Sequence, residues 1–451
     1  MTIALPSPRQ TPYGVLRALP VAGDAVVPPA CDVVIVGGGA SGIMAAWYLA
    51  GLGRKVVVCE KAEIACESSS RAFGWISELL LDPVKMPISL ESKRLWQELQ
   101  AEIGEIGYRR EGLAYLAEND HELGFYEEWL GTVRQQGSPG NTLLTREQTR
   151  ARFPGAARDW PGAILSPSDG SAEPQLSIPL MAQAARQRGV TLLTGCAVRT
   201  LDVAGGQVVG VVTEHGRIAA ENVLFAGNAW SRLFLGNHGI DVPQLWLQMS
   251  MGRTGPVDGP VGCGGQEDWA WRRQVDGGYS LGRLRDQQAP ITRDAIQLFG
   301  RFIPALKLER KNLKFSLGED ARRDWKRARR WGPDTVSPME RERVLSPRCD
   351  PRVPQASMRL NQREFPAMAQ TGIVETWAGA ITTTPDNMPI AGPIAALPGL
   401  WLATGCSYGL TWSPALGKML AEMITGRRPA LDPHPYRYER FFDGSPTPLR
   451  M

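Results

Sequence analysis

Three glycines and one glutamate have the spacing of a dinucleotide site. Gly37, Gly39 and Gly42 form the pattern G-x-G-x-x-G, and Glu60 follows roughly twenty residues later, where the fingerprint places an acid. The first glycine permits a tight turn, the second lets the backbone approach a pyrophosphate, and the third lets a helix pack against a strand. The helix N-terminus offers unpaired N–H groups to the anion. A carboxylate at position 60 can accept hydrogen bonds from ribose hydroxyls and would repel a 2′-phosphate.

The residues around these glycines predict a strand, a turn and a helix. Residues 32–36 (DVVIV) form a short apolar, β-branched run, and residues 41–53 have a helical pattern that ends in glycines. Residues 55–59 (KVVVC) predict a second strand that ends at Glu60. Together they predict a βαβ unit. Dinucleotide binding is favoured over a purely structural glycine turn, because that alternative leaves Glu60 unexplained.

Length and composition indicate an ordinary globular protein with more than one domain. The 451 residues are 43% hydrophobic, and the net charge of +4 is too small and dispersed to predict a nucleic-acid or membrane surface. No apolar run of about eighteen residues occurs, so no membrane span is predicted. The seven cysteines lack a C-x-x-C pair, which predicts neither a disulfide framework nor a metal site and favours a reducing cytoplasm. The basic run 322–330 (RRDWKRARR) is interpreted as a solvated helix face.

Several further segments occur in an order that resembles a known family. They are SSSRAFGWIS (68–77), SDGSAEP (168–174), AGNAWS (226–231), DGGYSLG (276–282), WAGAITTTPDNMPIAG (377–392) and TGCSYGLTWSPALG (404–417). Over nearly its whole length after residue 30, the chain resembles the flavin-dependent amine oxidoreductases typified by D-amino acid oxidase, glycine oxidase and monomeric sarcosine oxidase. The resemblance implies that the cofactor is FAD.

The resemblance also implies an α/β fold, in which a Rossmann-type FAD-binding domain carries an inserted α+β substrate domain with a mixed sheet. We expect residues 31–82, 161–243 and 369–430 to form the FAD-binding domain, and residues 83–160 and 244–368 to form the substrate domain. The proline-rich residues 1–30 are expected to form an extended N-terminal arm, and residues 431–451 a C-terminal tail.

Each matching segment is expected to contact one part of FAD. Residues 69–71 would contact the pyrophosphate and the flavin edge, because hydroxyls and a guanidinium suit an anion. Gly405 and Gly409 would let the backbone approach the flavin, and a helix beginning near Ser413 and Pro414 would direct its positive end at it. The residues expected to bind FAD are Gly37, Gly39, Ala40, Ser41, Gly42, Glu60, Lys61, Ser69, Ser70, Arg71, Gly74, Trp75, Val198, Gly227, Trp230, Gly379, Gly405, Ser407, Tyr408, Gly409, Leu410 and Thr411.

The sequence departs from the family at three positions. Ala380 stands where some members attach the flavin through a cysteine, so noncovalent FAD is expected, although Cys406 lies near the flavin loop. Ile381 stands where amino acid oxidases place an arginine for the substrate carboxylate, and Ser280 where sarcosine oxidases place an oxygen-activating lysine. A simple α-amino acid is therefore a weaker expectation, and the electron acceptor, oxygen or another, stays open. The candidates to replace the missing arginine are Arg272, Arg273 and Arg283.

In the family a neutral amine transfers hydride from its α-carbon to flavin N5, so the protein chiefly supplies orientation and a dry pocket. None of the four histidines lies in a matching segment, which argues against a histidine general base. Tryptophans 269 and 271 are expected in the roof over the flavin. The residues expected nearest the reacting substrate are Trp246, Gln248, Tyr279, Ser280 and Trp377.

The resemblance implies FAD-dependent oxidation of a C–N bond in an amine or amino acid, by oxidative deamination or dealkylation. Two alternatives stay open: a flavin-binding subunit of a heteromeric dehydrogenase, and a 2-hydroxy acid oxidoreductase. An aromatic hydroxylase is disfavoured, because the C-terminal segments match the amine-oxidising branch. The substrate, its stereochemistry and the oligomeric state are left undetermined.

Overall fold

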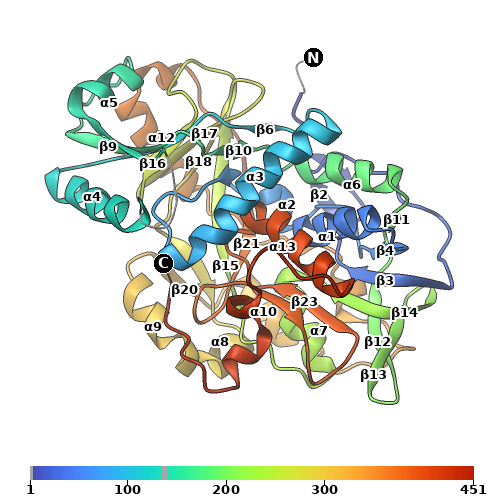
Figure 1. Ribbon diagram of the computed structural model, residues 1–451. Helices are drawn as coiled ribbons and strands as arrows, with labels where there is room; N and C mark the ends of the chain where they lie inside the picture. Colours follow the sequence, from blue (N-terminus) through green and yellow to red (C-terminus); the bar gives the residue numbers. More distant parts are fainter. Residues whose placement is uncertain (1–3, 135–139, 451) are drawn as a thin grey trace.

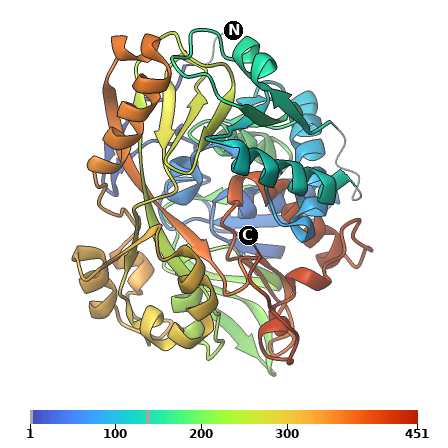
Figure 2. The same ribbon diagram turned by 90° about the vertical axis from the view of Figure 1, so that its left-hand side faces the viewer.

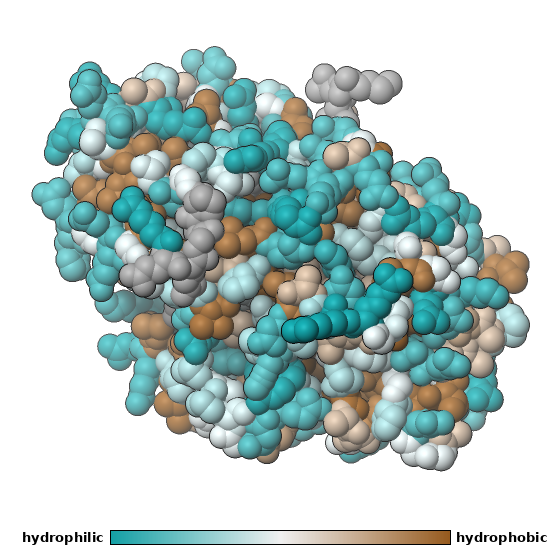
Figure 3. Space-filling model, in the orientation of Figure 1, coloured by the Kyte–Doolittle hydropathy of each residue, from teal (hydrophilic) through white to brown (hydrophobic). Residues whose placement is uncertain are grey.

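Two sheets organise the chain, and a computed structural model describes residues 4–134 and 140–450 of it (Figure 1). Figure 2, turned by a quarter, places the gold helices α8–α10 at one end of the second sheet. Figure 3 shows that the face seen in Figure 1 is mostly hydrophilic, with separate apolar patches.

The first sheet has eight strands and a parallel centre. Its order is β11, β4, β3, β14, β13 and β12, with β23 paired to β14 and β22 paired to β23. The central strands are buried, as a parallel sheet covered on both faces requires, and their sequences are almost continuously apolar. The strands are β3 (Ala30–Val36), β4 (Val56–Cys59), β11 (Thr191–Leu193), β12 (Val198–Ala204), β13 (Gln207–Thr213), β14 (Gly216–Phe225), β22 (Ile390–Pro393) and β23 (Leu400–Thr404).

Four helices pack around this sheet in one apolar core. They are α1 (Ala40–Gly51), α3 (Met86–Ile103), α6 (Ser177–Gln187) and α13 (Gly409–Ile424). The expectation that the last helix begins near Ser413 is wrong, because it begins at Gly409 and Pro414 lies inside it. Proline lacks the N–H that would bond the Leu410 carbonyl. That carbonyl instead accepts the Trp96 indole N–H and the Ser413 hydroxyl, each at 3.2 Å, so it is not left unpaired inside the helix.

The second sheet has ten strands and is mixed, as expected. Strands β15 and β21 pair antiparallel over almost their whole length, whereas β7 with β16 and β19 with β20 are parallel. The strands are β7 (Leu113–Leu116), β8 (Thr142–Thr145), β9 (Gly162–Ser166), β15 (Leu245–Thr254), β16 (Cys263–Gln266), β17 (Trp269–Arg273), β18 (Tyr279–Gly282), β19 (Gln287–Pro290), β20 (Leu313–Ser316) and β21 (Ile373–Thr383).

Smaller elements connect the two sheets. Strands β5 (Trp75–Ile76), β6 (Tyr108–Arg109) and β10 (Gly170–Ala172) form a three-stranded sheet. The other helices are α2 (Ser68–Arg71), α4 (Asp120–Arg134), α5 (Arg146–Arg152), α7 (Ser231–Asn237), α8 (Arg293–Gln297), α9 (Phe299–Glu309), α10 (Glu319–Lys326), α11 (Pro338–Arg341) and α12 (Arg352–Glu364). Short 3₁₀ turns are Pro83–Lys85, Asn228–Trp230, Pro366–Gln370, His434–Tyr436 and Tyr438–Phe441.

The first thirty residues are not a plain extended arm. A short hairpin, β1 (Arg9–Thr11) and β2 (Gly14–Leu16), interrupts them. Leu16 is buried with Ala62 and Cys66, so the hairpin covers the segment after β4. The hairpin folds back on the protein because this position buries the apolar Leu16 side chain.

Three elements cross the domain boundaries drawn from the sequence. Strands β9 and β21 belong to the second sheet, and α3 packs in the core of the first. We keep the division into an FAD-binding and a substrate domain as a proposal, with these elements as the links between the two.

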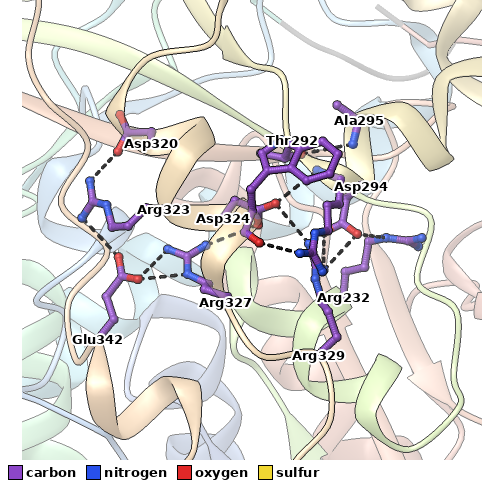
Figure 4. A network of polar contacts seen from close by, with 12 residues as sticks. Arg232, Thr292, Asp294, Ala295, Asp320, Arg323, Asp324, Arg327, Arg329 and Glu342 are labelled. Carbon is purple, nitrogen blue, oxygen red and sulfur yellow. Dashed lines mark hydrogen bonds and ion pairs between the residues drawn. The ribbon is translucent and has the colours of Figure 1, made fainter.

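Part of the basic run 322–330 is paired rather than solvated. Arg329 binds Asp294 of α8 at 3.0 Å and Asp324 of α10 at 3.1 Å, and Arg327 binds Glu342 at 2.7 Å (Figure 4). The interpretation as a wholly solvated face is therefore wrong, since Arg329 joins α8 to α10 and Arg327 pairs with the segment after α11.

Within residues 4–134 and 140–450, no helix combines the length and the apolar character needed to cross a bilayer. The same residues contain no group of three or more His, Cys, Asp or Glu side chains arranged to hold a metal ion.

Candidate functional site

A cavity of about 980 Å³ lies where the ends of the first sheet face the second sheet. This volume is near the upper end of the usual range for ligand and cofactor sites. Its wall combines the turn after β3, the end of β4, helix α2, strand β21 and the N-terminus of α13. Segments far apart in the sequence therefore enclose one space.

The glycine loop forms one end of the cavity. Gly37 has φ +115°, and a Cβ there would lie 2.7 Å from the Ala226 carbonyl oxygen. A Cβ at Gly42 would lie 2.1 Å from the Gly37 carbonyl oxygen, so the third glycine permits the close packing of α1. Gly39 lines the cavity directly. These are the tasks that the dinucleotide fingerprint assigns to its glycines.

Glu60 lies beside this loop because β3 and β4 are parallel neighbours. Its carboxylate accepts hydrogen bonds from the Gly38 N–H at 2.8 Å and from the Ala62 N–H at 2.9 Å. Burial raises the pKa of Glu60. Each carboxylate oxygen keeps a further lone pair, so the side chain can still accept from a ribose hydroxyl.

Lys61 and Trp230 form the next part of the wall. The Lys61 ammonium lies 4.0 Å from the centre of the Trp230 ring and pairs with Glu67 at 2.8 Å. The Trp230 indole N–H donates to the same carboxylate. These contacts hold the tryptophan ring rigid against the cavity.

Arg71 is the buried cation of the cavity wall. Its Nη1 donates to the Leu345 carbonyl at 3.1 Å and contacts the Ala378 carbonyl at 3.4 Å, whereas its Nη2 is buried without a hydrogen-bond partner. Burial lowers the pKa of the Arg71 guanidinium. An orphaned donor of this kind fits an oxygen-rich ligand, since leaving it unpaired costs about 1 to 3 kcal/mol. The residues present therefore fit FAD.

The structure brings most of the predicted residues to this cavity. Its lining includes Gly37, Gly39, Ala40, Ser41, Glu60, Lys61, Ser69, Arg71, Gly74, Trp75, Val198, Gly227, Trp230, Trp246, Gly379, Ser407, Tyr408, Gly409, Leu410 and Thr411. Gly42, Ser70 and Gly405 lie behind the wall. Gly405 has φ +70°, so its part is to turn the chain between β23 and α13.

Four residues expected near the substrate do not reach the cavity wall. Leu247, Met249 and Met251 line it, so the intervening Gln248 points to the other face of β15, where its amide donates to the Arg348 carbonyl. The Tyr279 hydroxyl donates to the Pro260 carbonyl at 3.0 Å. The Ser280 hydroxyl accepts from Arg272, and the Trp377 indole N–H donates to the Arg71 carbonyl. The structure therefore corrects the assignment of these four residues to the substrate site.

The roof tryptophans and the candidate arginine are also core residues. Trp269 and Trp271 are 1% and 0% exposed and stack on each other at 5.5 Å. Arg272 binds Glu173 at 2.8 Å and donates to the Phe73 carbonyl at 2.6 Å. It is therefore committed to the interior. Arg283 is paired with Asp268 at 2.9 Å, and Arg273 does not line the cavity.

Helices α8 and α9 supply cavity wall that the sequence did not predict. Their contributions include Ala295, Ile296, Phe299, Phe302 and Leu306. Asn228 and Leu449 were missed as well. The apolar spacing of α9 was the available signal, because large apolar side chains three and four positions apart require a partner surface.

Lys85 is a buried lysine close to the flavin loop. Its ammonium lies 5.1 Å from the centre of the Tyr408 ring and donates to the Arg450 carbonyl at 2.9 Å. Burial lowers its pKa to about 8 from 10.5. Between pH 8 and pH 10.5 the unfolded chain therefore binds more protons than the folded protein. Burial of the charged lysine lowers the free energy of unfolding in full below pH 8, and this loss disappears as the pH rises towards 10.5.

We therefore expect Lys85→Met to remove a pH-dependent contribution to stability. Between pH 8 and pH 10, the melting temperature of the wild type should gain relative to that of the variant. Differential scanning fluorimetry across this range measures the difference, with Lys55→Met, on the exposed surface, as the control. If the melting temperatures of the wild type and Lys85→Met changed in parallel with pH, the lowered pKa of Lys85 would be contradicted.

The Rossmann-type sheet, the glycine loop at its strand ends and the mixed sheet across the cavity define a dinucleotide-binding oxidoreductase. The family model described as DAO, FAD dependent oxidoreductase, matches residues 32–423. The chain therefore belongs to this family of FAD-dependent oxidoreductases, and the resemblance and the fold class expected from the sequence are confirmed.

Named relatives match most of this chain. Glycine oxidase of Pseudomonas aeruginosa is 26% identical over 416 residues, which is 90% of this chain and 97% of that protein. Mitochondrial sarcosine dehydrogenase of Homo sapiens is 24% identical over 92% of this chain, which spans only 42% of that protein's length. The solved L-amino acid deaminase from Proteus myxofaciens, in complex with anthranilate, has 34% identity and a TM-score of 0.91, and the match covers 94% of this chain and 97% of that one.

Proposed function

We propose that this protein oxidises a C–N bond of an amine or amino acid, with FAD as the electron acceptor. The observation that carries the proposal is that one cavity joins the glycine loop and Glu60 to an apolar chamber under the second sheet. When bound, FAD supplies the two-electron acceptor for this chemistry. The names of the relatives, which include glycine oxidase, sarcosine dehydrogenase and L-amino acid deaminase, support the same reaction class.

The residues of the chain would hold the cofactor and keep water away. The glycine loop and the N-terminus of α1 suit the pyrophosphate, and Glu60 suits the ribose. The Arg71 guanidinium offers its free Nη2 to an oxygen of the cofactor. Gly409 and Leu410 begin α13 at the cavity, so unpaired N–H groups point towards it. Apolar side chains from β15 and α9 exclude water from the reacting bond.

None of the four histidines lines the cavity among the described residues, which supports a mechanism without a histidine base. The electron acceptor that follows FAD is proposed to be oxygen or another electron acceptor. We further propose a cytoplasmic location, which seven free cysteines support.

The proposal is tested by anaerobic bleaching of the flavin absorbance. Purified protein is mixed with D- and L-amino acids, N-methyl amino acids, amines and 2-hydroxy acids. Bleaching by an amine or amino acid, followed by recovery in air, is the expected result. Bleaching by 2-hydroxy acids alone would replace C–N oxidation with alcohol oxidation. Bound FAD that no compound reduces would point to a subunit that needs a partner chain.

We expect acid to release all the flavin from the protein. Ala380 offers no nucleophile, and burial raises the pKa of Cys406 to about 12, which keeps that thiol protonated and unreactive. Precipitation with trichloroacetic acid should leave FAD in the supernatant and a colourless pellet. A yellow pellet that turns colourless in Cys406→Ser would overturn noncovalent binding.

A further inference from the structure

The cavity extends past the residues expected to hold FAD into a second space, which we call the outer chamber. Residues of helices α8 and α9 and of strands β15, β19 and β20 line it. Its wall is mainly apolar and includes Leu247, Leu284, Ile291, Phe302, Leu306 and Leu313. The chamber therefore suits the large apolar part of a ligand, because binding to an apolar wall is favourable when it buries apolar surface.

The charges of the outer chamber have one sign. Two carboxylates line it: Glu309, and Glu267, which is 67% exposed and lies 3.7 Å from the Arg285 guanidinium outside the chamber. The cations that line the whole cavity, within residues 4–134 and 140–450, are Lys61 and Arg71, and both follow β4 at the end expected to hold FAD. No lysine, arginine or histidine of the described chain lines the outer chamber.

The basic side chains near the chamber are bound to other partners. Arg283 pairs with Asp268 at 2.9 Å, and Lys314 pairs with Asp286 at 2.6 Å. Arg272 is committed to Glu173 inside the second sheet. A ligand carboxylate that entered the chamber would lose its hydration without gaining a counter-ion, and this desolvation would strongly disfavour binding.

Glu309 is placed to receive a cation. Its Oε2 accepts from the Asn312 amide at 2.8 Å, and Asn312 also lines the cavity, so the carboxylate is held in place. Burial and the Glu309 carboxylate together raise the pKa of Tyr408 to about 12, as expected for groups that interact across the cavity. A carboxylate on one side and an aromatic ring on the other is a combination that recognises an ammonium group.

We propose that the outer chamber selects primary or secondary amines that have an apolar carbon skeleton and carry no carboxylate beside the reacting C–N bond. This proposal rests on the C–N oxidation proposed above. The amine loses two electrons and two protons as FAD is reduced to its dihydro form. Water then hydrolyses the resulting imine to an aldehyde or ketone and releases ammonia or a smaller amine.

Pairs of compounds that differ only in the carboxylate test the proposal. The holoenzyme is reduced anaerobically by 2-phenylethylamine against L- and D-phenylalanine, and by 3-methylbutylamine against L- and D-leucine. We expect each amine to have a kcat/KM at least tenfold above that of its amino acids. Faster reduction by the amino acids overturns the choice of amines and leaves C–N oxidation standing. Failure of every compound to reduce bound FAD overturns both proposals.

The variant Glu309→Gln tests the acidic side chain itself. Loss of a charge-assisted contact should raise the KM for the amine about tenfold or more and change kcat much less. Glu128→Gln makes the same substitution at an exposed position of α4, outside the cavity, and should leave the KM unchanged. An unchanged KM in Glu309→Gln, with FAD bound normally, overturns the role of Glu309.

Discussion

The variant Gly42→Val is expected to lose its FAD. A Cβ at position 42 would lie 2.1 Å from the Gly37 carbonyl oxygen, and a backbone atom cannot rotate away as a side chain can. Overpacking of this severity costs about 3 kcal/mol or more. Because the loop can relieve the clash only by leaving the shape that suits FAD, the same cost falls on binding and corresponds to about a hundredfold in affinity. The ratio of flavin to protein absorbance after purification, and titration of the apoprotein with FAD, measure the loss.

Gly39→Ala separates binding from folding. Its Cβ would lie 3.1 Å from the Ser69 hydroxyl, which can shift, so the protein should fold with a normal circular dichroism spectrum. The added methyl group stands on the cavity side and should still weaken FAD binding. Gly236→Ala in α7, where a Cβ meets nothing within 4 Å, is the control. Normal flavin content in both loop variants would show that the cofactor does not bind at this turn.

The variant Arg272→Met is expected to destabilise the protein severely. Arg272 is 1% exposed, and the Glu173 carboxylate that it neutralises is 0% exposed. Removing Arg272 leaves Arg109, at 3.1 Å, as the ion-pair partner of the buried Glu173, so we expect a loss of about 3 kcal/mol, the lower end of the range for breaking a buried pair. The Phe73 carbonyl and the Ser280 hydroxyl lose a donor as well. Chemical denaturation, followed by circular dichroism, gives the free energy of unfolding.

Arg285→Met is the matched control for this experiment. Arg285 is 46% exposed and pairs with Asp268 at the surface, where such pairs contribute less than about 1 kcal/mol. If Arg272→Met were as stable as the control but failed to bind an amino acid substrate, Arg272 would be a substrate ligand rather than a structural residue.

Local patterns in the sequence were sufficient to predict the cofactor half of the fold. The strand, glycine turn, helix and second strand occupy residues 30–60, and each is specified by its own composition. The start of α13 was misplaced because proline is common in the first turn of a helix, and the partner that lets Pro414 sit deeper, Trp96, is distant in the sequence.

The substrate half was predicted less well, because neighbours decide which face of a strand is used. Alternation along β15 implies that Leu247 and Gln248 point to opposite faces, but only the packing of β21 and α9 shows which face borders the cavity. Tyr279 and Trp377 had the residue types of a substrate pocket. Their polar atoms instead bond to the carbonyls of Pro260 and Arg71.

The sequence by itself determined the site for the dinucleotide, because its parts lie within one βαβ unit and depend on glycine geometry and one acidic residue. Only the tertiary structure decided the character of the outer chamber. Arg272 finds Glu173 at a separation of 99 positions, and α9 closes over β15 from another part of the chain. Which charges are neutralised and which face the substrate depends on such long-range contacts, and residue type alone does not specify them.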